Sequence, residues 1–396
     1  MMQISPEIQL FIREHSSDDV RVLALQAKKY PDIDMPTVIT QIAGRKVAAE
    51  KIPSWWEIEK IWYPKHLSLE QCSSEITARY KARLLQGDSL TDLTGGFGID
   101  CSFLATGFKS ATYVERQEEL CEIAAHNFPV LNLNHINIKN EDGVTYLQAM
   151  SPVDCLFLDP ARRNEHGGKT VAISDCEPNV AELEELLLQK ANRVMIKLSP
   201  MLDLSLALKE LKQTQEVHIL SVNNECKELL ILLGQTSPAE ISIHCVNLFT
   251  KGTQKEQHFV FTREQEQCSE CTYTDSLETY LYEPNASLLK AGAFRSIAAA
   301  YPVRKLHPNS HLYTSDTFIE NFPGRIFRIV NQCSFNKKEV KENLAALKKA
   351  NVTVRNFPAT VAELRKRIHL AEGGDTYLFA STLNNGQKVL IRCEKV

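Results

Sequence analysis

Four acidic residues that follow predicted strands are the first candidates for chemistry in this sequence. Asp92, Glu115, Asp142 and Asp159 each stand at or just beyond the end of a short apolar segment. Ligands of parallel sheets bind at the carboxyl ends of the strands, so these side chains would gather at one edge. Each alone would more often be a helix cap or helix N-terminal charge than a functional group, and Glu115 and Asp142 do precede predicted helices. Their joint placement after successive strands favours a ligand site.

A glycine-rich turn follows the first of these acids, in the segment Asp92-Leu93-Thr94-Gly95-Gly96-Phe97-Gly98-Ile99-Asp100. Glycines allow positive φ and let a ligand approach the backbone closely. A carboxylate just ahead of the glycines does not suit a phosphate, and the Lys-Ser/Thr pair of a phosphate-binding loop is missing. A cationic or zwitterionic ligand suits Asp92 better. The ammonium and sulfonium groups of S-adenosylmethionine (SAM) meet that requirement.

The elements that would position these residues alternate regularly from Ser89 onward. The pattern predicts strands at 90–93, 111–115, 136–138, 155–158, 193–197, 217–222 and 229–233. It predicts helices at 99–106, 117–127, 143–149, 178–190 and 202–212. Such alternation indicates a parallel sheet covered on both faces. The last two strands are joined by only six residues, so we expect the final strand to be an antiparallel hairpin partner at the end of the sheet.

The remaining segments divide the chain further. Prolines break a helical N-terminal region, in which Trp55, Trp56 and Trp62 are interpreted as packing anchors. Beyond Gly234 we expect an antiparallel pair and a helix over 287–300, and the segment from 327 onward has the order β-α-β-α-β-β. The expected domains are 1–73 (helical), 74–235 (the α/β sheet), 236–324 (small α+β) and 325–396 (small, basic α+β).

Composition indicates a reduced, globular protein. No apolar run reaches the length of a membrane span, no secretory signal is evident, and the 11 cysteines lack the spacing of a disulfide scaffold, so a cytoplasmic location is expected. Residues 325–396 carry 14 Lys/Arg against 6 Asp/Glu, a balance of +8, whereas the remainder carries −12. This asymmetry indicates either a polyanionic partner for the C-terminal end or an ordinary solvated helical face. No pattern indicates an oligomeric state.

The segment from Glu75 to Leu233 resembles class I SAM-dependent methyltransferases, which have a Rossmann-like, seven-stranded α/β domain. The resemblance implies that the glycine turn wraps the amino-acid part of SAM, that Glu115 holds the ribose hydroxyls and that Asp142 faces the adenine amino group. The cofactor-binding residues implied are Asp92, Thr94, Gly95, Gly96, Gly98, Asp100, Glu115 and Asp142.

The segment Asp159-Pro160-Ala161-Arg162-Arg163 resembles the Asp/Asn-Pro-Pro-aromatic motif of nucleic-acid amino-methyltransferases. The resemblance implies catalytic roles for Asp159 and Pro160, which would orient an exocyclic amine toward the methyl group. Ala161 and Arg162 depart from that motif. Arg162 and Arg163 are candidate contacts to a base or a phosphate, because a guanidinium group can stack on a base and pair with a phosphate. Similar Asp-Pro motifs occur in carbon-5 RNA methyltransferases, for which Cys101, Cys155 and Cys176 are the available nucleophiles.

The whole chain resembles a bacterial methyltransferase family that carries Asp-Pro-Ala-Arg, a small ferredoxin-like module and a C-terminal THUMP-like domain. The matching pieces are 91–100, 159–163, 196–200, 224–228, 282–285 and 357–360. The glycine turn also resembles that of cap-trimethylguanosine synthases, which act on a guanine exocyclic amine. These resemblances imply methylation of an RNA base, at nitrogen rather than carbon, in ribosomal or transfer RNA.

Two other functions stay open: a catalytically inactive, RNA-binding protein of methyltransferase fold, and a small-molecule methyltransferase. The altered motif at Ala161 motivates the first. No metal is expected, because Cys268 and Cys271 form a single pair without a second one at zinc-site spacing.

Overall fold

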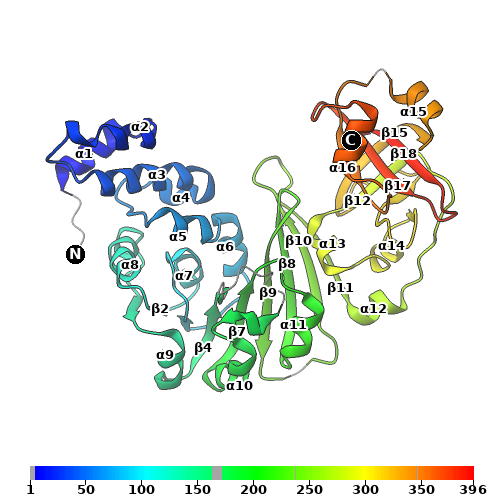
Figure 1. The fold of residues 1–396 in the computed structure, drawn as a ribbon. Coiled ribbons are helices and arrows are strands. Elements are labelled where there is room, and N and C mark those ends of the chain that lie inside the picture. Colours follow the sequence, from blue (N-terminus) through cyan, green and yellow to red (C-terminus); the bar gives the residue numbers. More distant parts are fainter. Residues whose placement is uncertain (1–4, 163–171, 237, 346) are drawn as a thin grey trace. The chain divides into compact units, whose positions relative to one another are not determined.

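The structure is a computed structural model of the chain (Figure 1). It describes residues 5–162, 172–236, 238–345 and 347–396. The chain divides into two compact units: unit 1 consists of Met1–Gln215 and Leu229–Pro238, and unit 2 of Glu216–Glu228 and Ala239–Val396. Within the described ranges, no helix combines the length and the apolar character needed to cross a membrane.

A nine-stranded sheet contains the strands predicted after Ser89. Its members are β1 (Ser89–Asp92), β2 (Ser110–Glu115), β3 (Ile136–Asn140), β4 (Val153–Leu158), β7 (Ala191–Leu198), β8 (Thr214–Val222), β9 (Glu225–Gly234), β10 (Ser242–Leu248) and β11 (Glu256–Thr262). Their order is β11-β10-β8-β9-β7-β4-β1-β2-β3. Neighbours from β3 to β7 pair in parallel, so β1, β2 and β4 end at the same edge of the sheet.

The position of β9 corrects one expectation. This strand lies next to β8, the strand with which a hairpin was predicted, but it lies between β8 and β7 instead of at the end of the sheet, and it pairs antiparallel with β7. The physical reason is in its sequence: Leu229 to Leu233 is an unbroken apolar run, and all five residues are fully buried. Such a run needs cover on both faces and therefore suits a central strand. The expected antiparallel pair beyond Gly234 is present as β10 and β11, which extend the same sheet past β8.

Five helices alternate with the strands of unit 1, in agreement with the sequence pattern. They are α7 (Ile99–Ala105), α8 (Glu118–Val130), α9 (Gly143–Ala149), α10 (Val180–Lys190) and α11 (Leu204–Glu210). The α10 helix begins two residues later than predicted, because the Asn179 side chain caps it by accepting a hydrogen bond from the Ala181 N–H.

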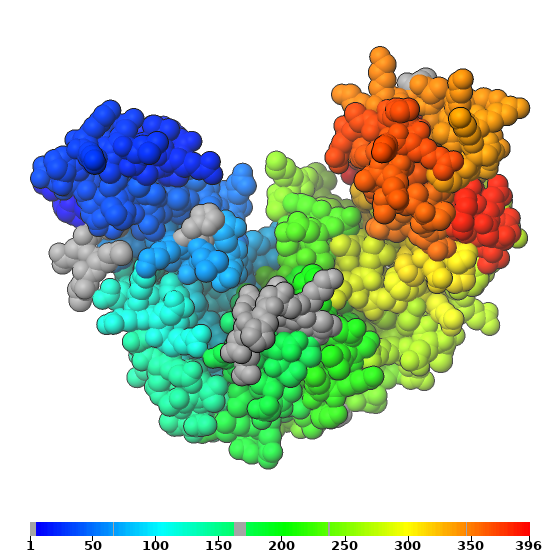
Figure 2. All heavy atoms as spheres, viewed as in Figure 1, coloured from blue at the N-terminus to red at the C-terminus, as the bar shows by residue number. Residues whose placement is uncertain are grey.

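The N-terminal region is helical, as expected. It comprises α1 (Pro6–Glu14), α2 (Val20–Leu25), η1 (Ala27–Lys29), α3 (Met35–Lys51), α4 (Pro53–Trp56), α5 (His66–Gln71) and α6 (Glu75–Ala82). Trp55 is a packing anchor: it is 2% exposed and meets the Phe97 ring edge-on at 5.2 Å. Trp62 stacks on His126. These contacts hold the N-terminal region against the turn after β1 and against α8, and Figure 2 shows the blue N-terminal atoms adjoining the cyan ones.

A second, seven-stranded sheet has the order β13-β14-β12-β15-β18-β17-β16. It consists of β12 (Tyr280–Pro284), β13 (Arg304–Lys305), β14 (Tyr313–Ser315), β15 (Gly324–Ser334), β16 (Asn351–Val354), β17 (Thr376–Thr382) and β18 (Lys388–Lys395), with α15 (Lys337–Leu344) and α16 (Val361–Ile368) after β15 and β16. This is the predicted β-α-β-α-β-β order. The helix expected over 287–300 is divided into α13 (Ala286–Ala291) and α14 (Ser296–Ala300), because Gly292 adopts a left-handed φ of 78° and ends the first. A short α12 (Arg263–Cys268) follows β11.

Candidate active site

The end of β1 buries a carboxylate that is only half satisfied. Asp92 is 1% exposed, and its Oδ1 accepts a hydrogen bond from the Thr94 N–H at 2.9 Å. Its Oδ2 has no hydrogen-bond partner among the described residues. Burial raises the pKa of Asp92 to about 8, against the weaker opposing effect of the Thr94 N–H. A buried acceptor without a partner is costly, so this oxygen is a ready site for a cationic donor.

The glycine turn lies directly against β2. The Gly95 N–H donates to the Val114 carbonyl at 2.8 Å, and a Cβ at Gly95 would lie 2.2 Å from the Tyr113 ring. Gly96 and Gly98 have φ of 54° and 86°, in the left-handed region that glycine favours. The bare backbone of this turn is therefore required by its own packing, and it leads straight into α7.

Glu115 and Asp142 lie beside this turn, at the ends of the next two strands. Glu115 is 8% exposed and accepts hydrogen bonds from the Gly96 N–H at 2.9 Å and the Gln117 N–H at 2.8 Å. Asp142 is exposed and caps α9 through the N–H groups of the next residues. A Cβ at Gly143 would lie 2.2 Å from the Leu93 carbonyl oxygen, so the start of α9 lies against the chain just after β1.

Asp159 and Pro160 follow β4 and are joined to the same turn. The Asp159 N–H donates to the Thr94 hydroxyl at 2.6 Å, and Pro160 is buried. The Asp159 Oδ2 lies 2.5 Å from the Lys197 Nζ. Burial raises the pKa of Asp159 and Lys197 opposes this effect. Because 36% of the side chain is exposed, we expect the carboxylate–ammonium pair at neutral pH.

Of the two arginines predicted to contact substrate, the structure describes only Arg162. Arg162 belongs to β5 (Ala161–Arg162), whose backbone pairs with β6 (Cys176–Glu177) after η2 (Ile173–Asp175). Arg163 lies outside the described residues.

A buried network of charges connects Asp100 to Asp159 and was not predicted from the sequence. Asp100 Oδ1 lies 2.9 Å from the Lys81 Nζ, and its Oδ2 lies 3.2 Å from the Lys197 Nζ and accepts a hydrogen bond from the Ser73 hydroxyl at 2.7 Å. Lys81 is fully buried and Lys197 is 7% exposed. Burial alone would raise the pKa of Asp100, but the two ammonium groups outweigh it and hold that pKa below its usual range. Lys197 therefore bridges Asp100 and the candidate catalytic Asp159.

The cysteines proposed for a carbon-5 mechanism do not have the properties of nucleophiles. Cys101, Cys155 and Cys176 are all buried. Burial raises the pKa of Cys101 well above its usual value and that of Cys155 to about 11. Only the thiolate is a good nucleophile, so these two groups are unsuited to a covalent step at neutral pH.

One solved structure is similar to almost the whole chain. It is a protein from Porphyromonas gingivalis W83 described as a "putative methyltransferase", with 35% sequence identity, a TM-score of 0.87 and 98% of each chain covered. Two family models match the C-terminal part: a ferredoxin-like domain over residues 280–323 and a THUMP-like domain over residues 324–395. These matches begin at β12 and at β15. None of the curated proteins matches.

Partial likenesses also occur. An rRNA methylase from Streptococcus thermophilus is 14% identical with a TM-score of 0.29, covering 40% of this chain and 93% of that one. The TrmK protein of M. capricolum, in complex with S-adenosyl-homocysteine, is 12% identical with a TM-score of 0.32, covering 41% and 68%. Such low TM-scores give these two likenesses no weight. The likeness to the P. gingivalis protein is sufficient by itself to show the family. This chain and that protein belong to one family, with a class I methyltransferase fold followed by ferredoxin-like and THUMP-like domains.

Proposed function

We propose that this protein is a SAM-dependent methyltransferase that methylates an exocyclic nitrogen of a base in ribosomal or transfer RNA. Residues 74–235 form the methyltransferase domain, and the THUMP-like segment holds the RNA. The observation that carries the proposal is the connection through Thr94. This residue bonds to the half-satisfied Asp92 on one side and to the backbone of Asp159 on the other. It therefore joins a site for a cationic cofactor to a group that can orient an amine.

The residues around the glycine turn fit SAM. The unpartnered Asp92 Oδ2 would accept hydrogen bonds from the ammonium group of the cofactor, whose charge would displace the proton that Asp92 keeps in the free protein. The turn at Gly95, Gly96 and Gly98 would lie along its amino-acid part, Glu115 would accept from the ribose hydroxyls, and Asp142 would face the adenine amino group. When bound, SAM supplies the electrophilic methyl group.

Asp100 has a different role in this proposal from the one that the resemblance implied. Both of its oxygens are engaged by Lys81, Lys197 and Ser73. It therefore supports the start of α7 and the position of Lys197, and does not contact the cofactor.

Asp159 and Pro160 would position the acceptor nitrogen. The Asp159 carboxylate and the Pro160 carbonyl can each accept a hydrogen bond from an exocyclic amine, which leaves the nitrogen lone pair directed away from both. Lys197 holds the Asp159 carboxylate in place through its 2.5 Å contact. The same carboxylate is placed to take the proton that the nitrogen loses after methylation.

The C-terminal segment supplies the surface for a polyanion. Its balance of +8 includes five exposed lysines on and just after α15: Lys337, Lys338, Lys341, Lys348 and Lys349. Phosphate contacts of this kind release counterions, so RNA binding should weaken steeply as salt increases.

Calorimetry with SAM tests the cofactor assignment. We expect binding to the wild-type protein and loss of binding in Asp92→Ala and in Glu115→Ala. Asp88→Ala is the matched control, because this exposed aspartate directly precedes β1 and its side chain pairs with the surface Lys109. Unchanged affinity in both site variants would refute the assignment.

Nucleoside mass spectrometry of RNA from a deletion strain tests the activity. A methylated nucleoside should be missing and should return with the wild-type gene but not with Asp159→Ala. An unchanged nucleoside profile, with SAM binding intact, would favour a small-molecule substrate if RNA binding is also absent at low salt. If RNA binding persists, it would favour an inactive RNA-binding protein.

A further inference from the structure

Three histidines and a glutamate lie on one face of β8, β10 and β11. Glu216 and His218 are two residues apart on β8 and so point to the same face. His244 on β10 is the direct neighbour of His218 in the parallel register. His258 on β11 pairs with Val246, which shares the face of His244. All four residues belong to unit 2.

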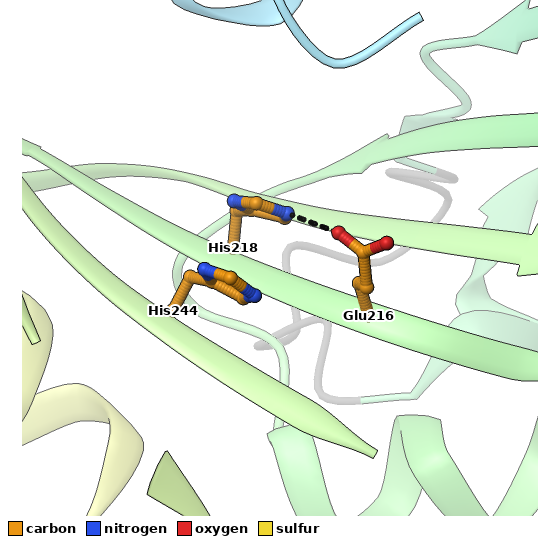
Figure 3. Close-up of side chains that lie close together, drawn as sticks. All are labelled: Glu216, His218 and His244. Carbon is orange, nitrogen blue, oxygen red and sulfur yellow. Dashed lines mark hydrogen bonds and ion pairs between the residues drawn. The ribbon is translucent and has the colours of Figure 1, made fainter. Parts of the chain in front are cut away.

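Their side chains converge, as Figure 3 shows for the first three. Glu216 Oε2 lies 3.2 Å from the His218 Nε2. The rings of His218 and His244 stack, with centroids 4.3 Å apart. One potential ligand atom from each of Glu216, His218 and His244 lies within 4.8 Å of the others.

We propose that Glu216, His218 and His244 bind a divalent transition-metal ion of the zinc type. Two imidazoles and one carboxylate are a common ligand set for such ions, with water in the remaining position. Ligands about 2.0–2.1 Å from a tetrahedral Zn²⁺ are about 3.3 Å from one another. The 3.2 Å separation of Glu216 and His218 already has this value. Bringing His244 to the same distance takes a change of at most about 1.5 Å and a rotation of its ring out of the stack with His218, because both lone pairs must point at the ion.

The surroundings of His244 match those of a metal-bound histidine. Its Nδ1 lies 3.2 Å from the His258 Nε2, which leaves Nε2 for the ion. Metal-binding histidines usually have the second ring nitrogen fixed by such a partner.

An ion pair alone accounts for less of this arrangement. It would explain the contact of Glu216 with the deeply buried His218, but it would not explain why the His244 Nδ1 points toward His258. The Glu216 side chain is 31% exposed, so an ion can enter from solvent on this side. The ligands come from two strands, with His258 on a third, and their spacing in the sequence therefore gives no metal signature. The ion would tie β8 to β10.

Metal titrations of the full-length, metal-free protein test the proposal. They are best done in a Cys268→Ser/Cys271→Ser background, which removes the cysteine pair in unit 2. We expect calorimetric binding of Zn²⁺ and no binding of Mg²⁺ at the same concentration, because imidazole ligands disfavour Mg²⁺. Co²⁺ should give visible d–d bands without a near-ultraviolet thiolate band. A thiolate band would place the metal on other cysteines and refute the site, as would a lack of Zn²⁺ binding.

Three variants locate the ion. Glu216→Gln and His244→Ala should weaken Zn²⁺ binding by more than about 100-fold, and His258→Ala, which removes a supporting group, by about 10- to 100-fold. His126→Ala is the control, because this histidine stacks on Trp62 in unit 1 and should leave the affinity unchanged. The melting temperature in chelator shows that each variant folds, and Zn²⁺ should raise it only where the site is intact. Equal Zn²⁺ affinity in the wild type and the two ligand variants would overturn the proposal.

Discussion

Replacing Asp92 by asparagine should stabilise unit 1 while it removes affinity for a cationic ligand. Asp92 is 1% exposed, and burial raises its pKa from 3.8 to about 8. At about 1.4 kcal/mol per pKa unit, this shift corresponds to a ceiling of about 6 kcal/mol between the two protonation states. Asparagine carries no charge, so the variant avoids the cost of burying an ionised carboxylate.

The sign of the pH dependence follows from proton binding. Between pH 3.8 and about 8 the folded state keeps the Asp92 proton and the unfolded state loses it, so wild-type stability falls as pH rises through this window. The stability of Asp92→Asn relative to wild type should therefore rise by up to about 1.4 kcal/mol per pH unit and level off above pH 8. The asparagine Nδ2 would stand in the place of Oδ2 without a hydrogen-bond partner, which lowers the stability of the variant by about 1–3 kcal/mol at every pH and leaves the slope unchanged.

Urea unfolding followed by tryptophan fluorescence measures this effect. All three tryptophans belong to unit 1, so their signal reports that unit. Asp88→Asn, at the exposed position just before the same strand, should show no such pH-dependent difference. A difference between Asp92→Asn and wild type that stays constant from about pH 5 to about pH 8 would refute a buried, proton-retaining Asp92. Calorimetry should show that the same variant has lost SAM binding, the opposite direction from its gain in stability.

Two further substitutions test the packing around the site. Lys197→Met leaves Asp159 and one oxygen of Asp100 without their cation, so it should lower the free energy of unfolding by about 3 kcal/mol and reduce methylation more than SAM affinity. Lys109→Met removes the cation of an exposed pair and should change neither the stability nor the methylation. Equal behaviour of the two variants would argue against the network. Gly95→Ala places a methyl group against the buried Tyr113 ring and should cost about 1–3 kcal/mol in urea unfolding. Gly107→Ala is the control and should be tolerated, because a Cβ there would lie 3.7 Å from the Leu104 carbonyl oxygen. If Gly95→Ala is equally stable, the turn can move to accept the methyl group.

The helices, the strands and the positions of the acids at strand ends could be predicted because they depend on residues close together in the sequence. Alternating apolar segments and glycines are local signals, so the strands that end at Asp92, at Glu115 and just before Asp159 could be placed in advance. The parallel pairing then brings their carboxyl ends to one edge. How each acid is satisfied could not be predicted in this way.

The lysine network shows why the rest was missed. Lys81 stands in a helix and resembles any surface lysine in the sequence, yet its partner Asp100 follows 19 positions later and Lys197 follows 97 positions after Asp100. The only local signal was Lys197 inside the apolar strand β7, and its neighbours in the sequence do not indicate which carboxylates it pairs with. The place of β9 and the meeting of His218 with His244 are likewise set by strand order, which depends on the whole sheet.

The order of the strands has a consequence for dividing the protein into fragments. The chain passes from unit 1 to unit 2 after Gln215, returns after Glu228 and leaves again after Pro238, so no single cut separates the two. A fragment that starts at residue 236 lacks β8. The β10 strand would then present an unpaired row of backbone groups from Ser242 to Leu248. An open edge of this kind recruits other chains, so such a fragment should aggregate even though the THUMP-like segment within it is intact.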